Sequence, residues 1–507
     1  MRREVADRAP ARTAGSHKYR SLLVFLVCLC LASCINLGPD YEQPEADVEP
    51  AWQETQNPRI TNAALVDTTW WTSTFQDPVL DKLVSTALED NLSLRSAALR
   101  VLQSQQQLRI AIGNQYPQQQ QGTGSASKQR ENRNTFEDYA VGFNVSWEVD
   151  FWGRFRRQIE SAEATLDASV ASYDGALVSL VSQVASNYIL IRAFQERIVV
   201  ARENVTLQEE SLRIAQAKFD AGDRSVLDVE QAETLLYNTK ASVSALETSL
   251  QQAKNALAVL LGKPPQDLGY LLGEQEPVPA TPPEVALGMP QDLIRRRPDI
   301  RVAERQLAAQ SAQIGFAITD LYPAFSIGGA IGTNSDETSD LFNSESERWD
   351  FFGAFQWNLF NYGRLRSNIR LQDAIFQQRL VDYLNTVLQA QADVENSIVA
   401  YLRTHEQLDA YRLAAAASQR AVDVATIQYQ EGDIDFDTLI TTLASNVQQQ
   451  DLFASTQGDV ANNLVQVYRA LGGGWSIRQG RDPVDSLPES MKDEMRERTK
   501  QWKGVLE

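Results

Sequence analysis

The sequence predicts a mainly α-helical chain with four β-strands, written as two tandem copies of one unit that joins a strand pair to a long helical hairpin. Three observations predict this fold class: landmarks that recur about 210 residues apart, two proline-free stretches of 68 residues, and a segment in which apolar and polar residues alternate strictly. An internal repeat is the most informative of these, because it fixes the architecture of the whole chain.

The repeat is carried by landmarks that occur in the same order in both halves. Trp147 recurs as Trp357, and the aromatic-Gly-Arg motif of residues 152–154 recurs at 362–364, both with an offset of 210. Further pairs are Gly222 with Gly432, Gly262 with Gly472, and Tyr116 with Tyr322, the last pair with an offset of 206. Coincident landmarks in one order indicate a duplication.

Two long helices are predicted at residues 154–221 and 364–431, which contain no proline and a single glycine, Gly175. At about 1.5 Å per residue each helix is roughly 100 Å long. Apolar residues of the first stretch recur in steps of three and four, as in a coiled-coil seam. Helices of this length must pack along other long helices.

Each long helix is expected to turn back on itself. Gly222 and Gly432 stand where a helix ends, in positions suited to the left-handed conformation. Asp223 and Asp433 are expected to open the return helices, to residues 261 and 471, because carboxylates favour a helix N-terminus. Shorter helices are expected near 79–115 and 299–321, the second after Pro298.

Strands are expected between the short and the long helices. In residues 139–151 every odd position is aromatic or valine and the even positions are small or polar, over more than the ~9–11 residues that a membrane strand requires. Residues 351–359 repeat the pattern less cleanly, since Phe352 and Phe360 fall on the other face. Residues 325–331 give a shorter strand, and only its place in the repeat argues for a strand near 118–128.

Four strands cannot close a membrane barrel alone, because open sheet edges are not tolerated in lipid. Two chains would supply eight strands and three would supply twelve, and counting alone leaves both open. The other interpretation is a sheet in water with one buried face. The long helices that separate the strands, and the export signal described next, count against it.

The N-terminus predicts an exported lipoprotein. Six Lys or Arg residues precede an apolar run at 22–31, which is shorter than the ~20 residues of a spanning helix. The run ends in Leu31-Ala32-Ser33-Cys34, which resembles a bacterial lipobox, so residues 1–33 are expected to be a signal peptide and Cys34 the lipidated first mature residue. The alternative is an ordinary secretory signal with a chance cysteine.

Composition excludes several function classes. A net charge of −19 argues against nucleic acid, whose phosphates attract Lys and Arg clusters. Cys28, Cys30 and Cys34 are the only cysteines, and two of them leave with the signal. His17 lies in the leader, and His405, in a polar helical context, is expected at the surface. Metal sites and histidine-based triads need several such groups, so we expect no metal, no cofactor and no enzyme. No helix beyond the leader is expected to span a membrane.

The chain resembles the OprM/NodT-type outer-membrane factors, relatives of TolC, from Cys34 to Trp475. The residues that carry the resemblance, beyond the repeat, are Gly38-Pro39-Asp40-Tyr41, Trp70-Trp71, Asp77-Pro78, Asn91-Leu92, Arg296-Arg297-Pro298-Asp299 and Ala470-Leu471-Gly472-Gly473-Gly474-Trp475. The resemblance implies a homotrimer with a twelve-stranded barrel in the outer membrane of a Gram-negative bacterium and a helical tunnel in the periplasm. It also implies a passive export duct for small molecules, served by a periplasmic adaptor and an inner-membrane pump, usually of the RND class.

This resemblance divides the chain into six segments. They are the signal peptide (1–33), an N-terminal extended segment (34–78), the first repeat (79–270), a linker (271–298), the second repeat (299–474) and a polar C-terminal tail (475–507). The competing hypothesis is a lipoprotein scaffold that binds envelope proteins through its coiled hairpins and has no pore. The alternating strands favour the duct, because a scaffold has no need of them.

The resemblance also implies two sets of site residues at the hairpin turns. An iris is expected near Gly432, where carboxylate rings favour cations, with candidates Asp433, Asp435 and Asp437. Relatives often place an aspartate nine residues after the turn glycine, where this chain has Thr441, and sometimes where it has Thr438. The acidic ring has therefore moved or been lost; alternatively, Asp433 and Asp435 merely cap a helix. Gly222, Asp223, Arg224 and Gly432 are expected to contact the adaptor.

Overall fold

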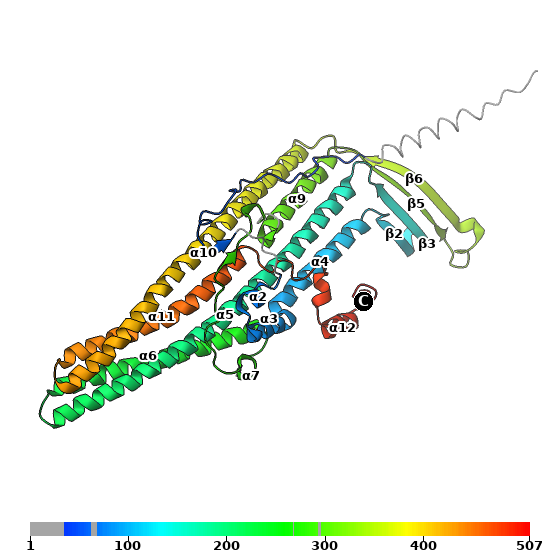
Figure 1. The fold of residues 1–507 in the computed structure, drawn as a ribbon. Helices are drawn as coiled ribbons and strands as arrows, with labels where there is room; N and C mark the ends of the chain where they lie inside the picture. The colour runs from blue at the N-terminus through cyan, green and yellow to red at the C-terminus, as the bar shows by residue number, and fades with distance from the viewer. Residues whose placement is uncertain (1–34, 62–67, 267, 293–295, 507) are drawn as a thin grey trace, which may run out of the picture. The chain divides into compact units, whose positions relative to one another are not determined.

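The computed structural model describes residues 35–61, 68–266, 268–292 and 296–506, which fall into two compact units. The first, the sheet unit, comprises residues 35–44, Ser104–Leu166 and Arg305–Leu380. The second, the helical unit, comprises Glu45–Gln103, Asp167–Glu304 and residues 381–506. Long helices and a strongly curved ribbon of strands are the main elements of the chain (Figure 1).

The sheet unit is built on four antiparallel strands in the order β2-β3-β5-β6. Their bounds are Gln119–Glu131 (β2), Asn134–Val149 (β3), Ala324–Ser335 (β5) and Glu347–Gln356 (β6). All four predicted strands are therefore present. The last is shifted toward the N-terminus, so Phe360 lies outside it rather than on its other face. Phe352 does lie on the face opposite Phe351, where its ring covers Gly328.

The duplication is visible in the hydrogen bonds of the two repeated tryptophans. Trp147 Nε1 donates to the carbonyl of Gln115 at 3.0 Å, and Trp357 Nε1 donates to the carbonyl of Leu321 at 2.9 Å. The acceptors are the residues that precede the two Tyr-Pro landmarks. The same side chain thus ties the strands to the preceding helix in both copies.

The long helices have nearly the predicted bounds: Arg154–Asp220 (α5), Val226–Leu260 (α6), Arg364–Glu431 (α10) and Phe436–Ala470 (α11). Gly222 and Gly432 have positive φ, +75° and +88°, and the next amide donates back five residues to Lys218 and Gln428, as in a Schellman turn. The prediction for Asp223 and Asp433 was wrong. The return helices begin later, with Ser225 and Asp435 at their N-caps.

The shorter elements connect these parts. The predicted helix near 79–115 is two helices, because Asn91 adopts an extended conformation between them and its side chain caps the second. The bounds are Ile60–Thr61 (β1), Trp70–Phe75 (α2), Pro78–Asp90 (α3), Leu92–Gly113 (α4), Gly269–Leu272 (α7), Val285–Ala286 (β4), Pro290–Asp292 (η1), Pro298–Thr319 (α9), Ser344–Ser346 (η2), Pro483–Ser486 (η3), Glu489–Arg498 (α12) and Lys500–Trp502 (η4).

Within the described residues, α5 is the one helix that is long and apolar enough to pass a test for a membrane span. Of its most apolar window, 67% is buried inside the protein, which is the pattern of a helix in a packed core. The expectation that no helix beyond the leader spans a membrane remains a prediction.

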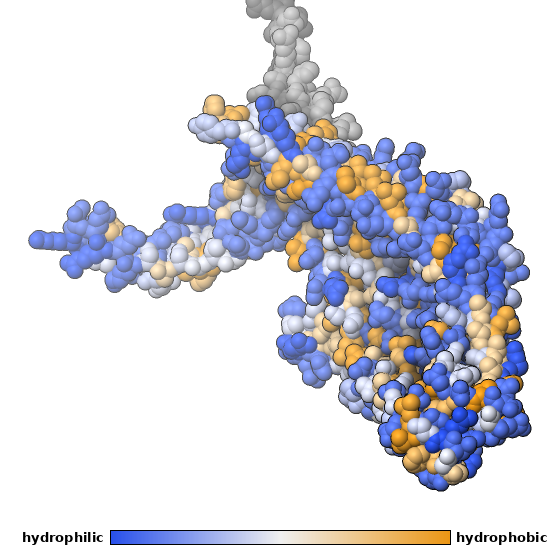
Figure 2. Space-filling view, turned by 90° about the vertical axis from the view of Figure 1, so that its left-hand side faces the viewer, coloured by the Kyte–Doolittle hydropathy of each residue, from blue (hydrophilic) through white to orange (hydrophobic). Residues whose placement is uncertain are grey.

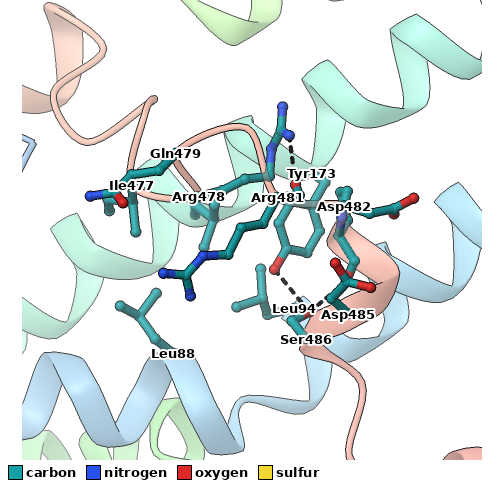
Figure 3. A pocket seen from close by; sticks show the side chains of 12 residues that line it. Leu88, Leu94, Tyr173, Ile477, Arg478, Gln479, Arg481, Asp482, Asp485 and Ser486 are labelled. Carbon is teal, nitrogen blue, oxygen red and sulfur yellow. Dashed lines mark hydrogen bonds between the residues drawn. The ribbon is translucent and has the colours of Figure 1, made fainter. Parts of the chain in front are cut away.

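The C-terminal segment is packed onto the helical unit. Arg478 donates to both carboxylate oxygens of Asp174 at 2.7 and 3.2 Å, and Arg301 Nη1 lies 3.3 Å from the same carboxylate. Figure 3 shows the Tyr173 hydroxyl pointing at the Ser486 hydroxyl, with an O···O distance of 3.1 Å. A hollow of about 330 Å³ is lined by Tyr173, Arg478 and Ser486 together with Leu94.

His405 is half-buried rather than a surface residue. Its Nε2 lies 3.4 Å from Thr281 Oγ1, and the edge of its ring meets Tyr401 with centroids 5.3 Å apart. Burial first, and then the charge of Arg59, lowers the pKa of His405, while Asp409 opposes both. The imidazole is therefore held neutral.

Acid is expected to destabilise the protein through His405. A lowered pKa in the folded state means that the stabilisation is complete above the ordinary pKa of about 6.5 and is lost as the pH falls through the folded value. We expect the unfolding temperature to fall between pH 7.5 and pH 5, and His405→Gln to lose part of this dependence. Thermal unfolding followed by circular dichroism measures it. Equal acid sensitivity of both proteins would contradict the assignment.

Candidate functional site: the sheet face and the hairpin tips

The strand register sorts the sheet into one apolar and one polar face. Directly opposite residues share a face in an antiparallel sheet. Val145 pairs with Gly329, which pairs with Phe351, and the apolar face also carries Phe143, Trp147, Phe325, Ile327, Ile331, Trp349 and Phe355. The opposite face is mainly polar and carries Asn144, Ser146, Glu148, Ser326, Asn334, Arg348 and Asp350, with Phe352 as its aromatic exception. The apolar positions of the predicted alternation therefore form one continuous apolar surface across the strands.

Aromatic side chains cluster where the strands meet the helices. Trp152 Nε1 donates to the carbonyl of Pro323 at 2.8 Å, and its ring lies against Tyr322 with centroids 4.8 Å apart. Phe151 contacts both Trp152 and Phe325, at 4.6 and 5.6 Å. Rings with an apolar body and a hydrogen-bonded polar tip suit the boundary between lipid and water.

The segment that follows Cys34 is fixed to the base of this sheet, while Cys34 itself lies outside the described residues. Arg157, which is buried, donates to the carbonyls of Leu37 and Gly38 at 2.9 and 3.0 Å and to the carboxylate of Asp40 at 3.0 Å. The amide of Leu37 donates to the carbonyl of Trp152 at 3.2 Å. These hydrogen bonds hold residues 37–40 beside the aromatic cluster.

The two hairpin turns of the helical unit are joined by an ion pair and a hydrogen bond. Arg224 Nη1, in the first turn, lies 3.3 Å from Asp435 Oδ1 in the second. Tyr429, near the end of α10, donates from its hydroxyl to Asp228 Oδ2 of α6 at 3.4 Å. The guanidinium of Arg224 also lies 5.9 Å from the centre of the Tyr429 ring. We call these four residues the tip lock.

Tyr429 is completely buried and anchors the tip lock in an apolar cluster. Its ring meets Phe436 with centroids 5.3 Å apart, and Lys218 Nζ lies 5.3 Å from its centre. Burial, and then the carboxylate of Asp228, raises the pKa of Tyr429 to about 12. The phenol is therefore protonated, and able to donate, at every physiological pH. Its stabilisation is present below the ordinary pKa of about 10 and is lost only as the pH rises through the folded value.

The iris candidates share one exposed face. Asp437, Thr438 and Thr441 are exposed on α11, opposite the buried positions Phe436, Leu439 and Leu443. Asp433 is exposed in the turn, and Asp435 is both the N-cap of α11 and a member of the tip lock. The Asp435 side chain accepts from Arg224 but from none of the first backbone amides of α11, so the interpretation of Asp435 as a simple cap is incomplete.

The adaptor-contact candidates also come together. Gly222, Asp223 and Arg224 line a hollow of about 490 Å³ with Leu227 and Asp435, while Gly432 lies in the neighbouring turn. Val226 and Leu227 expose apolar side chains beside these charges, at 51% and 59%. The face in Figure 2 shows such orange patches among the blue hydrophilic residues that dominate it. A mixed surface of this kind suits a protein partner.

Tyr429, and Asp228 as its hydrogen-bond partner, were missed from the sequence. Tyr429 occupies the position of Phe219 in the first copy, so comparison of the two copies showed only that an aromatic residue recurs there. The replacement of a phenyl ring by a phenol near a turn was the available signal, because a buried hydroxyl needs a hydrogen-bond partner. No group of three or more His, Cys, Asp or Glu side chains in the described ranges is arranged to hold a metal ion.

Comparisons with known proteins agree with this architecture. The family profile described as "Outer membrane efflux protein" matches residues 83–263 and 289–473, which separates the two copies. The probable outer membrane lipoprotein SilC of Salmonella typhimurium is 28% identical over 459 residues, covering 90% of this chain and 98% of SilC. Nodulation protein T of Rhizobium leguminosarum bv. viciae is 30% identical over 472 residues, covering 93% and 96%.

A solved structure gives the same result for the fold. The outer-membrane channel OprN superposes with a TM-score of 0.82 at 31% identity, covering 87% of this chain and 99% of that one. The likeness extends over the strands and the long helices together, so the predicted TolC-like fold class is confirmed. This chain belongs to the outer membrane efflux protein family.

Proposed function

We propose that three copies of this chain form the passive outer-membrane duct of a tripartite efflux system. The duct receives small molecules from a periplasmic adaptor and from an inner-membrane pump, which the family resemblance assigns to the RND class. One observation carries the proposal: a four-stranded sheet with a continuous apolar face and two unpaired edges belongs to the same chain as two long helical hairpins with a charged tip. The pump supplies the energy, and the duct needs no catalytic residue or cofactor.

The unpaired edges support an oligomeric barrel. In the described part of the chain, the outer edges of β2 and β6 have no strand partner. Lipid offers no hydrogen bonds to such edges. With four alternating strands, β6 of one copy runs antiparallel to β2 of the next, so copies close a ring without a break in the pattern.

Exposed apolar residues on the helices support the same assembly. Along α10, large side chains stand exposed at Leu371, Val381, Leu388, Leu413, Val424 and Ile427. With Val399, which is 40% exposed, the residues from Val381 to Val424 follow in steps of 7, 11, 14 and 11, which are multiples of 3.5–3.7 residues, as expected of a stripe that packs against another helix. A second copy of the chain is the partner that would cover this stripe in a helical tunnel.

Disulfide cross-linking in membranes tests the assembly. We would pair Thr123→Cys on β2 with Arg348→Cys, Asp350→Cys or Phe352→Cys on β6, which samples the register between copies. One of the pairs should give a three-chain product on a non-reducing gel. Thr123→Cys with Ser326→Cys, on an inner strand, is the control and should give none. A product that stops at two chains would contradict the trimer, and no inter-chain product from any pair would contradict the barrel.

We further propose that Cys34 is acylated and that the lipid lies beside the aromatic cluster at the base of the sheet. The hydrogen bonds of Arg157 to Leu37 and Gly38 bring the chain to this place, and SilC is named as an outer membrane lipoprotein.

Cys34→Ser is expected to abolish incorporation of labelled palmitate while most of the protein still reaches the outer membrane. The reason is that the barrel anchors the protein independently of the lipid. Metabolic labelling and membrane fractionation measure the two effects. A fully soluble Cys34→Ser protein would show that the strands do not insert, and unchanged labelling would place the lipid elsewhere.

A further inference from the structure

A layer of side-chain amides interrupts the apolar core of the helical unit. Asn446 Nδ2 on α11 donates to Asn204 Oδ1 on α5 at 3.2 Å and to Gln419 Oε1 on α10 at 3.3 Å. Gln450 Nε2 donates to the same Gln419 oxygen at 2.8 Å, and Asn204 Nδ2 donates to Gln450 Oε1 at 2.6 Å. Asn204 and Asn446 are 1% and 0% exposed. We call these four residues the amide layer.

The amide layer lies between two apolar clusters. On the side of the hairpin turns is the tip cluster, which contains Ile214, Ala215, Val229, Ala232, Val422, Ala425, Tyr429, Phe436, Leu439 and Leu443. On the other side is a cluster of Ile198, Ala201 and Leu246. In α5, α10 and α11, the residues of the amide layer lie farther from the hairpin turn than any residue of the tip cluster. The tip cluster is therefore separated from the rest of the core on three helices.

Two further polar side chains extend the layer toward the turns. Gln208 and Ser211 of α5 are 2% and 5% exposed, and neither side chain finds a hydrogen-bond partner among the described residues. Buried amide and hydroxyl groups are nearly always satisfied by protein or by ordered water. Buried polar groups of this kind are the usual hydrogen-bond partners of internal water.

Packing and hydrogen bonding respond differently to movement. Close-packed apolar side chains resist sliding, because every displacement opens a void or a clash. Side-chain amides can exchange one partner for another or for water while remaining hydrogen-bonded. A buried polar layer in a helical bundle also fixes the register of the helices at a cost in stability. A bundle with such a layer is therefore weakest there.

We propose that the amide layer, with Gln208 and Ser211, is a hydrated hinge about which the turn ends of α10 and α11 move away from those of α5 and α6 when the duct opens. The inference rests on the proposed function, because a hinge for opening has a role only in a duct that is closed at its tip. Opening then breaks the tip lock, lets the tip cluster repack between the two hairpins, and rearranges amides and water, while the cluster of Ile198, Ala201 and Leu246 stays packed.

The test removes the two water-binding side chains without leaving another side chain unpaired. Gln208→Leu with Ser211→Ala replaces two side chains that have no protein partner. Added to Arg224→Ala with Tyr429→Phe, which breaks the tip lock, it should lower the open probability of single channels by about tenfold. In an otherwise native chain it should slow hydrogen exchange of residues 436–443. Ile198→Leu, an apolar exchange in the neighbouring cluster, is the control and should change neither.

The possible outcomes are distinct. The lock-broken channel could conduct while Gln208→Leu with Ser211→Ala changes neither its open probability nor the hydrogen exchange of residues 436–443. In that case the hinge is refuted and the proposed function stands. If the lock-broken protein does not conduct at all, the proposed function fails, and hydrogen exchange alone decides on the hinge. Gln208→Met carries the same test should the double substitution prevent assembly.

Discussion

Breaking the tip lock is expected to raise the open probability of the duct by about 100-fold or more in the variant Arg224→Ala with Tyr429→Phe. The variant removes the ion pair to Asp435, the hydrogen bond to Asp228 and the contact between guanidinium and ring. An exposed ion pair contributes about 0.2–1 kcal/mol and a neutral hydrogen bond about 1 kcal/mol. Even about 1 kcal/mol per copy becomes about 3 kcal/mol in a trimer, which is two orders of magnitude in an equilibrium.

Single-channel recording in planar bilayers measures this effect. Arg202→Ala provides the control, since it removes an exposed ion pair to Glu247 farther along the same hairpin. We expect the control to behave like the native protein. An open probability that does not differ between lock variant and control would show that these contacts do not hold the duct closed.

Removal of the Arg478 guanidinium is expected to cost about 3–5 kcal/mol of stability, because Arg478→Leu leaves a buried carboxylate with an incomplete set of partners. Asp174 is 1% exposed, and Arg478 supplies two of its hydrogen bonds, with Arg301 as the remaining ionic partner. The segment that carries Arg478 is the one drawn in Figure 3. We expect a fall in unfolding temperature and faster proteolysis after residue 475.

Arg481→Leu separates this effect from a general effect of charge. Arg481 lines the same hollow as Arg478 but is exposed, so its removal should change the unfolding temperature little. Thermal unfolding and limited proteolysis of the two variants provide the comparison. If both lower the stability equally, the ion pair with Asp174 is not what holds the C-terminal segment.

Most of the fold could be predicted from the sequence because repeated landmarks and helical periodicity are local signals. Tyr116-Pro117, Trp147 and Gly222 mark the same structural positions as their counterparts in the second copy. The strand near 118–128 shows where local pattern fails. Its positions on the apolar face are Gln120, Gly122, Gly124, Ala126 and Lys128. Three of them lie opposite Phe143, Val141 and Tyr139, so the neighbouring strand supplies the apolar surface.

The site was less predictable, because its contacts join residues far apart in sequence. Arg224 and Asp435 were both candidates, but nothing in either turn shows that they pair. Tyr429 and Asp228 meet only because α6 and α10 pack together. The late start of α11 at Phe436 matches that of α6 at the equivalent Val226, so the turn geometry is shared by the two copies.

We expect the exposed face of α11 to line a passage which the tip lock closes, and cysteine labelling tests this. The only cysteines of the native sequence are Cys28, Cys30 and Cys34, so Thr441→Cys in the lock-broken chain gives one addressable thiol once the leader is removed and Cys34 is acylated. A charged methanethiosulfonate reagent should reduce the single-channel conductance of this variant. The same reagent should leave a chain with Glu230→Cys, exposed on α6, unaffected. Unchanged conductance at Thr441, or an equal loss in both variants, would contradict the account.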